Sequence, residues 1–263
     1  MKDVLEIVSR MNYITPDKYL SGVIKEYDIQ KANISMLRYK NIIDDDKYLY
    51  YTRMDKMSRE IEIGMMIKRN QDIYQAIQTG IIEAKQQFVS ENEINDSSKI
   101  VRVANDAIYI IGIPYIKTVD FCDGYVHFNQ KGVYNVMMNL NGIIFFIDLT
   151  SSYPFVDIKG IREGVLGLHV DHILSIIINT VITLERAGVK DAINSLSEFI
   201  EDYVKLNLDI RYYREFNSES MYKIKNSPYK TYEVSDINDI DINYNLTLLR
   251  ELFGILVNML GTY

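Results

Sequence analysis

The spacing of the apolar residues changes abruptly near residue 100, and this change constrains the fold more than any other feature of the sequence. Before it, apolar residues recur every three or four positions, which places them on one face of a helix. They are Ile73, Ile77, Ile81, Ala84 and Phe88. The opposite face is predicted to be polar, and its residues are Glu83, Lys85 and Gln86. After it, residues 100–103 and 107–113 have the composition of strands and flank Ala104-Asn105-Asp106, so we expect a β-hairpin with these three residues at its tip.

Shorter patterns predict the remaining elements. A strand at 23–29 leads directly into a helical segment, and a helix capped by Asp55 or Ser58 runs to residue 67. The cluster Asp44-Asp45-Asp46 is predicted to be a solvated turn. Later strands are expected at 125–128, 132–140 and 142–149, with weaker candidates at 209–216, 220–225 and 230–234. Later helices are expected at about 161–186, 189–207 and 246–260.

Two turn signals connect these elements. Asn141-Gly142 is a strong signal for a tight hairpin, and Gly188 is suited to a left-handed cap between two helices. The order of elements predicts an α+β fold, in which an antiparallel or mixed sheet with packed helices is followed by a helical region. We therefore expect an α+β domain at 1–155 and a mostly helical domain at 156–263.

The composition restricts the class of protein. The chain has 263 residues, of which 48% are hydrophobic and 25% charged, as in ordinary globular proteins. Its single Cys excludes an internal disulfide framework and a Cys-based zinc site. Neither the N-terminal segment nor the most apolar run, 173–184, has the pattern of a signal peptide or a membrane span. We expect a cytoplasmic protein without a membrane partner, and the residue bias suggests a phage or an AT-rich bacterium as the source.

Two carboxylates stand out by their positions. Asp28 lies near the end of a strand that runs into a helix, and Asp106 lies at the hairpin tip. If the two strands are neighbours, both side chains reach one spot, where a pair of carboxylates can hold two Mg²⁺ ions about 4 Å apart. Mg²⁺ needs few protein carboxylates when substrate phosphates complete its shell. A simpler interpretation makes Asp28 a helix N-cap and Asp106 a turn former.

The sequences around these carboxylates resemble a known family. Residues 26–34, EYDIQKANI, are similar to polymerase motif A, in which a strand ends in a metal-binding Asp and runs into a helix. Residues 100–109, IVRVANDAIY, are similar to motif C, the acidic hairpin of the palm. In this order the two motifs resemble the palm of family B DNA polymerases and, more loosely, that of reverse transcriptases. The likeness covers roughly residues 20–140 and places a thumb-like region after them.

The resemblance implies a chemistry and a set of partners. Asp28 and Asp106 would hold Mg²⁺ or Mn²⁺, and the protein would add nucleotides to a 3′-OH. Lys68 and Arg69 occupy the place of the basic fingers helix and would grip a triphosphate. Lys131, in the stretch FNQKGVY, would contact the primer or the incoming phosphates. The implied partners are nucleic acid, nucleoside triphosphates and a protein that supplies the missing domains of a split polymerase.

The sequence departs from the family pattern at three places. Family B motif C carries two Asp one residue apart, and Ala104 stands where the first is expected. Aligned as a reverse transcriptase, Asn105 replaces the first Asp instead. Asn33 stands where the family usually has an aromatic residue that blocks the ribose 2′-OH. We also expect no exonuclease domain before residue 20.

Two alternatives therefore stay open beside a working nucleotidyltransferase. One is a palm relative without catalysis that is retained as a scaffold. The other is a non-enzymatic structural or interaction subunit of a replication, transcription or virion assembly. Its partner surface would be the apolar face at 73–88 or the apolar helix at 173–184.

Overall fold

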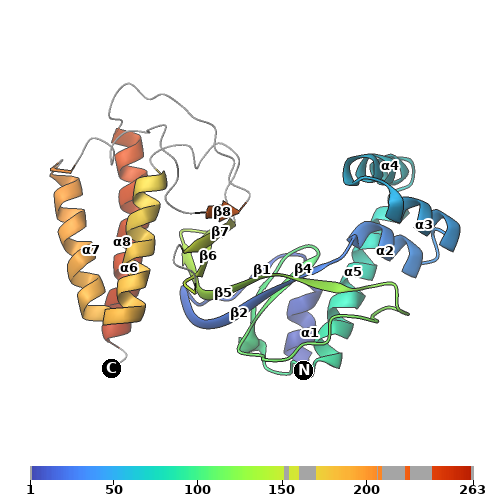
Figure 1. Cartoon of the computed structure of the whole chain (residues 1–263), viewed down its shortest axis with the longest axis horizontal. Helices are drawn as coiled ribbons and strands as arrows, with labels where there is room; N and C mark the ends of the chain where they lie inside the picture. Colours follow the sequence, from blue (N-terminus) through green and yellow to red (C-terminus); the bar gives the residue numbers. More distant parts are fainter. Residues whose placement is uncertain are drawn as a thin grey trace. The chain divides into compact units, whose positions relative to one another are not determined.

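A computed structural model describes residues 2–150, 154–159, 170–205, 207–208, 223–225 and 239–261. The α+β fold class is confirmed, since runs of helices and runs of mostly antiparallel strands follow one another along the chain. The chain forms two compact units (Figure 1). The first comprises residues 1–16 and 23–133, and the second comprises residues 17–22 and 134–263.

The first unit contains five α-helices. They are α1 (Lys2–Ser9), α2 (Ala32–Tyr39), α3 (Asp45–Arg53), α4 (Lys56–Arg69) and α5 (Gln71–Glu91). Its strands include β1 (Tyr13–Ile14), β3 (Ile100–Val103) and β4 (Ala107–Ile111), and a short 3₁₀ helix at Ser97–Lys99 precedes β3. Strand β2 (Tyr19–Ile29) and strand β5 (Phe128–Leu140) begin in one unit and end in the other.

The sheet of the first unit is antiparallel. β4 pairs with both β3 and β2, and β1 pairs with β3 at the edge. Alternate residues of β2 and β4, such as Tyr27 and Ile108, enter a core that also takes in Phe88 of α5 and Val4 of α1. Helices α1 and α5 lie side by side against this core (Figure 1). The predicted apolar face of α5 is confirmed, because four of its five residues are buried, namely Ile77, Ile81, Ala84 and Phe88.

Local capping explains where helices α3 and α4 begin. The Asp55 carboxylate accepts a hydrogen bond from the Ser58 amide at 3.0 Å, so the predicted cap of α4 is confirmed. The prediction of a solvated turn at 44–46 is wrong, because these residues begin α3. There the Asp44 carboxylate accepts a hydrogen bond from the Lys47 amide at 2.8 Å. A short acidic run suits a helix N-terminus as well as a turn, since both offer free N–H groups.

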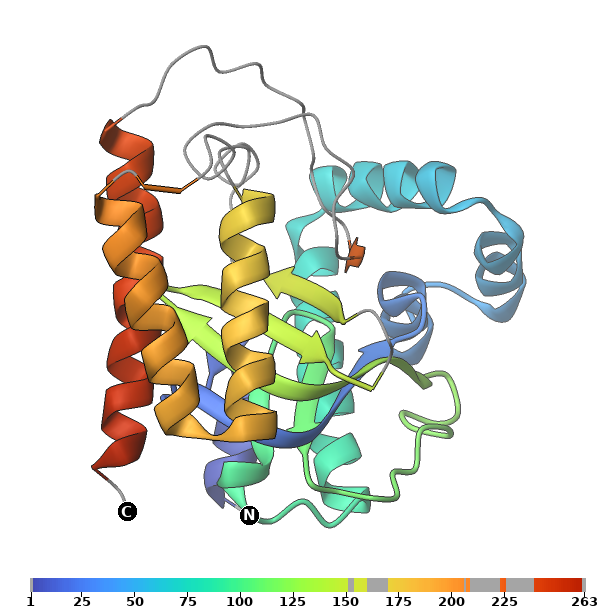
Figure 2. The same ribbon diagram turned by 60° about the vertical axis from the view of Figure 1, so that its left-hand side comes forward.

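Among its described residues, the second unit combines strands with three helices. Its strands include β6 (Ile143–Asp148), β7 (Phe155–Lys159) and β8 (Lys223–Lys225), and its helices are α6 (Val170–Ala187), α7 (Val189–Val204) and α8 (Asp239–Leu260). β5, β6 and β7 are antiparallel neighbours, and β8 pairs with β7 in parallel. The three helices stand side by side (Figure 2). Gly188 separates α6 from α7 as predicted, but its φ of 98° and ψ of 175° lie outside the left-handed helical region that we predicted for it. The positive φ still favours glycine at this junction.

The two units divide the chain earlier than the boundary that we predicted between residues 155 and 156. Val136 of β5 and Ile147 of β6 share a core with Ile177 of α6 and Leu252 of α8. The strands β5 to β7 therefore belong with the helices that cover them, because burial of their shared apolar face holds the unit together.

Some of the weaker predictions fall on residues that the structure leaves undescribed. Of the three weak strand candidates, 220–225 contains β8, whereas 209–216 and 230–234 lie outside the described residues. The predicted helical segment 161–169 also lies outside them.

Candidate functional site

The structure places Asp28 and Asp106 on neighbouring strands of the first unit. Asp28 lies opposite Ala107 in the β2–β4 register. One residue further along, the Ile29 amide donates a hydrogen bond to the Asp106 carbonyl at 2.9 Å. The Ala104 amide donates to the Ala107 carbonyl at 2.9 Å and closes the turn between β3 and β4. The predicted hairpin is therefore present, and its tip lies beside the end of β2.

Asp28 is half-buried and faces a lysine of β5. The Lys131 ammonium lies 3.9 Å from the Asp28 carboxylate, with 45% and 29% of the two side chains exposed. An ion pair this exposed contributes little to the stability of the fold. Its main effect is to bring a positive charge close to the Asp28 carboxylate. The alternative role of Asp28 as a helix N-cap is wrong. The capping position of α2 belongs to Lys31, which adopts a left-handed conformation with a φ of 50° and makes no side-chain capping bond.

Asp106 lies close to a lysine that we predicted on the wrong face of α5. Lys85 was predicted on the polar face of α5, but its side chain is fully buried. Its ammonium donates to the carbonyls of Ala104 and Asn105 at 3.4 and 3.3 Å. Burial lowers the pKa of Lys85 to about 8, and the charge of Asp106 partly offsets that effect. The pattern did contain a signal, because position 85 follows Ile81 by four residues and shares its side of the helix.

A second polar group shares the sheet with Asp28. Glu26 lies two residues before Asp28 and opposite Tyr109, so all three side chains belong to one face. The Tyr109 hydroxyl donates to the Glu26 carboxylate at 2.8 Å, and both residues are buried. The guanidinium of Arg102 lies 5.5 Å from the centre of the Tyr109 ring. This face thus carries a cluster of polar side chains, whereas the opposite face enters the apolar core.

The other predicted nucleotide-binding residues lie on helices α2 and α4 rather than on the strands of the two carboxylates. The Asn33 amide donates to the Glu60 carboxylate at 2.8 Å, which joins α2 to α4. Lys68 and Arg69 lie in the last turn of α4, where both are exposed. Neither forms an ion pair with a described residue, so their assignment to a triphosphate stays a prediction.

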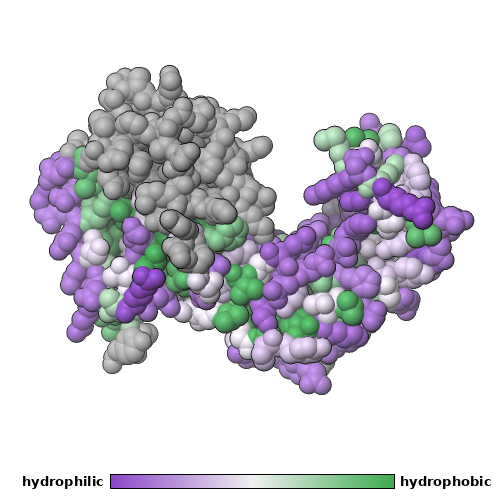
Figure 3. Space-filling model, in the orientation of Figure 1, coloured by the Kyte–Doolittle hydropathy of each residue, from purple (hydrophilic) through white to green (hydrophobic). Residues whose placement is uncertain are grey.

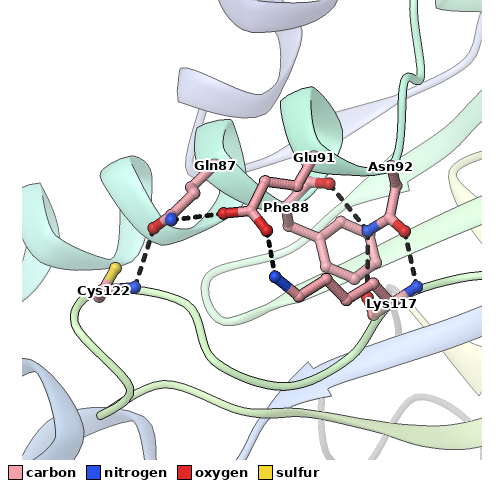
Figure 4. A network of polar contacts seen from close by, with 6 residues as sticks. All are labelled: Gln87, Phe88, Glu91, Asn92, Lys117 and Cys122. Carbon is pink, nitrogen blue, oxygen red and sulfur yellow. Dashed lines mark hydrogen bonds and ion pairs between the residues drawn. The ribbon is translucent and has the colours of Figure 1, made fainter.

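A polar network orders the loop that leads from β4 to the strand of Lys131 (Figure 4). The Gln87 side chain accepts a hydrogen bond from the Cys122 amide at 2.8 Å. The Asn92 side chain accepts from the Lys117 amide at 2.6 Å and donates to the Lys117 carbonyl at 3.0 Å. Glu91 forms an ion pair with the Lys117 ammonium. The C-terminal part of helix α5 thus holds both this loop and, through Lys85, the hairpin tip.

The same loop contains the chain's only cysteine. Cys122 is buried, and burial raises the pKa of its thiol to about 12, with further contributions from Glu83 and Asp123. The thiol is therefore protonated at neutral pH and is a poor nucleophile.

Asp28 shares a face of the sheet with Glu26, whereas Asp106 lies near Lys85 of α5, so a divalent-cation site shared by the two carboxylates stays a prediction. Two Asp on neighbouring strands suit Mg²⁺, which takes few protein oxygens when phosphates complete its shell. Among the described residues, no three His, Cys, Asp or Glu side chains form a metal-sized group. A cation bound here would therefore depend on Asp28, Asp106 and oxygens that the substrate supplies.

The second unit has a cavity of its own, which contains none of the predicted residues. Its volume is about 920 Å³, and its lining includes Tyr19, Glu185 and Lys190. The Tyr19 hydroxyl donates to the Glu185 carboxylate at 2.7 Å, and Ser21 donates to the other carboxylate oxygen at 2.9 Å. Burial and this hydrogen bond raise the pKa of Tyr19 well above its usual range. These contacts join β2 to the end of α6 within the unit.

The fold defines an α+β protein. In it, the β3–β4 hairpin with Asp106 at its tip lies beside strand β2, which carries Asp28 near its end. The family model described as Bacteriophage PBS1 gene 130 protein matches residues 6–262. The chain belongs to this phage protein family. No curated protein matches it. Across the part of the chain that the structure describes, no helix combines the length and apolar character needed to cross a membrane.

Proposed function

We propose that this phage protein is a palm-like nucleotidyltransferase that adds nucleotides to a 3′-OH with two Mg²⁺ ions. The observation that carries the proposal is the pairing of β2 with β4, which sets Asp28 beside the hairpin of Asp106. The order of these elements, a strand running into a helix and later an acidic hairpin, supports it further. The proposed setting is the cytoplasm of the infected host.

The residues of this chain would divide the work between them. Asp28 and Asp106 would hold the cations, which neutralise charge on the attacking and leaving oxygens when bound. Lys131 would leave its weak pairing with Asp28 and contact a phosphate, which requires little energy because the pair is solvent-exposed. Asn33, Lys68 and Arg69 would contact the incoming nucleotide only if α4 approaches the sheet. A partner protein would supply the missing domains.

Primer extension tests this function. The full chain is incubated with a primed template, dNTPs or NTPs, and Mg²⁺ or Mn²⁺. We expect extension by the wild type and a loss of about a hundredfold or more in Asp28→Asn and Asp106→Asn, because each removes a carboxylate that would hold the cations, and the cations stabilise the negative charge of the transition state. Asp148→Asn is the matched control, since Asp148 ends β6 and accepts hydrogen bonds from Thr150. Activity that survives in Asp106→Asn contradicts the assigned role.

One further observation favours a second candidate, a non-enzymatic interaction subunit. The outer face of α4 carries Met57, Ile61 and Met65, of which 75%, 56% and 47% are exposed. The residues are four positions apart and form one stripe, and Figure 3 shows apolar side chains over α4. Exposed apolar side chains that gather on one surface are typical of protein-binding sites.

A photo-crosslinker at position 61 tests this candidate in infected cells. We expect one discrete crosslinked protein if α4 binds a partner. The control is the same crosslinker at Tyr115, which is 83% exposed. Equal crosslinking at both positions would contradict a specific surface on α4. A chain that binds Mn²⁺ but does not extend primers would instead be a palm relative without catalysis.

A further inference from the structure

Lys85 is the only lysine with a fully buried side chain in the part of the chain that the structure describes. Its ammonium donates to three carbonyls, those of Arg10, Ala104 and Asn105, at 3.3, 3.4 and 3.3 Å. An ammonium has three N–H donors, so this set uses all of them. The distances are longer than usual for a hydrogen bond, which makes the attraction between the charge and the three carbonyl dipoles the main contribution.

The three carbonyls come from two separate segments. Ala104 and Asn105 form the hairpin tip just before Asp106, and Arg10 directly follows the end of α1. A cation is favoured at a helix C-terminus, where the carbonyls are unpaired and the helix dipole is negative. The neighbouring Gln86 also reaches the end of α1 and donates to the Ser9 hydroxyl at 2.8 Å. Helix α5 therefore contacts the end of α1 through both residues and the tip through Lys85.

The tip itself contains little that would fix its conformation. It has no glycine, and the backbone bond that closes its turn joins Ala104 to Ala107. Ala104 stands where the family B motif carries a carboxylate, and here its carbonyl binds the Lys85 ammonium instead. A buried ammonium is costly unless its partners stay in place, so the charge and the tip conformation depend on each other.

We propose that Lys85 is a positioning residue that fixes the hairpin tip and thereby the place of the Asp106 carboxylate. The metal-binding part of this inference rests on the proposed function, whereas the fixing of the tip does not. Residues that hold metal ligands in place without touching the metal typically change its affinity 10- to 100-fold when they are lost.

The test compares the full-length wild type with Lys85→Met, which keeps most of the side-chain length but removes the charge and the donors. Amide hydrogen exchange is measured at Ala104 and Ile29, whose hydrogen bonds close the turn and join the tip to β2. We expect exchange at both amides to be about tenfold faster in Lys85→Met, because the tip opens locally. Exchange at the Asn139 amide, which bonds the Lys18 carbonyl in the second unit, should not change.

Mn²⁺ binding, followed by electron paramagnetic resonance, is the second measurement. We expect affinity about tenfold weaker in Lys85→Met than in the wild type. Lys40→Met is the matched control, because Lys40 pairs with Glu83 of the same helix at 2.6 Å and comes from the end of α2 rather than from the tip. If Lys85→Met does not fold, Lys85→Gln replaces it, since glutamine keeps two donors without the charge.

The outcomes separate this inference from the proposed function. Amide exchange at Ala104 and Ile29 that is faster in Lys85→Met but not in Lys40→Met supports the positioning role of Lys85. Exchange rates and Mn²⁺ affinity that change no more than in Lys40→Met would overturn it. A wild type that binds no Mn²⁺ would overturn the proposed function and the metal-binding part of the inference, and the exchange rates would then decide the role of Lys85 in fixing the tip.

Discussion

The two hairpins β3–β4 and β5–β6 form their turns by different means. In the β5–β6 hairpin, Asn141 and Gly142 take positive φ angles of 50° and 83°, and the Asn139 side chain accepts a hydrogen bond from the Gly142 amide at 3.1 Å. In the β3–β4 hairpin, the carbonyls of Ala104 and Asn105 bind the ammonium of Lys85. The β5–β6 turn is therefore specified by adjacent residues, whereas the β3–β4 turn depends on a helix about 20 positions earlier in the chain.

This difference shows which of the two kinds of turn is better suited to hold a functional side chain in place. A turn built from Asn and Gly has a fixed geometry, but it has few connections to the rest of the protein. A turn held by a buried cation is connected to the core, so the position of Asp106 depends on the packing of α5. Sites whose geometry must be accurate need such supporting contacts.

The largest expected effect concerns pH, because the β3–β4 hairpin depends on a titrating group. The pKa of Lys85 is about 8 in the folded chain, below its ordinary value of 10.5. The unfolded chain therefore holds this proton more tightly, and the free energy of unfolding contributed by Lys85 rises as pH increases above 8. Between about pH 7 and pH 9.5 we expect the metal-free wild type to gain about 2 kcal/mol relative to Lys85→Met.

Urea unfolding of both proteins at several pH values measures this difference. Comparing the two proteins cancels the titration of tyrosines and other groups that they share. Gly142→Ala, in the other hairpin, should keep the pH dependence of the wild type. Parallel stability curves for the wild type and Lys85→Met would show that the Lys85 proton is not linked to folding.

The β5–β6 hairpin should instead be sensitive to backbone conformation. Gly142 has a φ of 83° and open space where a Cβ would lie, so Gly142→Ala tests backbone strain without a steric clash. We expect a loss of about 1–2 kcal/mol in the free energy of unfolding. Gly64→Ala is the control, because Gly64 lies within α4, also has open space, and should gain about 0.5–1 kcal/mol from helix propensity. A loss in Gly64→Ala as large as in Gly142→Ala would argue against strain at the turn.

The same contrast explains what the sequence could predict. Local patterns located the strand Ile100–Val103, the cap Asp55 and the turn Asn141-Gly142, because neighbouring residues determine each of them. The strand predicted at 132–140 begins earlier than expected, since β5 starts at Phe128 and includes the end of the segment predicted at 125–128. Pairing with neighbouring strands overrides the weak local signal between the two segments.

Features that depend on tertiary contacts were predicted poorly. The helical spacing could place Lys85 beside the apolar face, but its full burial could not be inferred, since its partners come from the end of α1 and from the hairpin tip. The contact of Asn33 with Glu60 depends on how α2 and α4 pack. By contrast, the adjacency of Asp28 and Asp106 followed from two strand assignments and the assumption that the strands pair.

The smallest expected effect concerns the β5–β6 turn. It separates the contribution of the backbone conformation of Gly142 from that of the Asn139 side-chain hydrogen bond. Asn139→Ala removes the bond from the Gly142 amide but leaves the glycine free to take its positive φ. Since this bond is exposed, water replaces it, and we expect a loss of only about 0.5 kcal/mol in urea unfolding. The effect should be smaller than that of Gly142→Ala, because the turn depends chiefly on backbone conformation. A larger loss in Asn139→Ala would mean that side-chain contacts specify this hairpin as well, and the contrast between the two turns would then be one of degree.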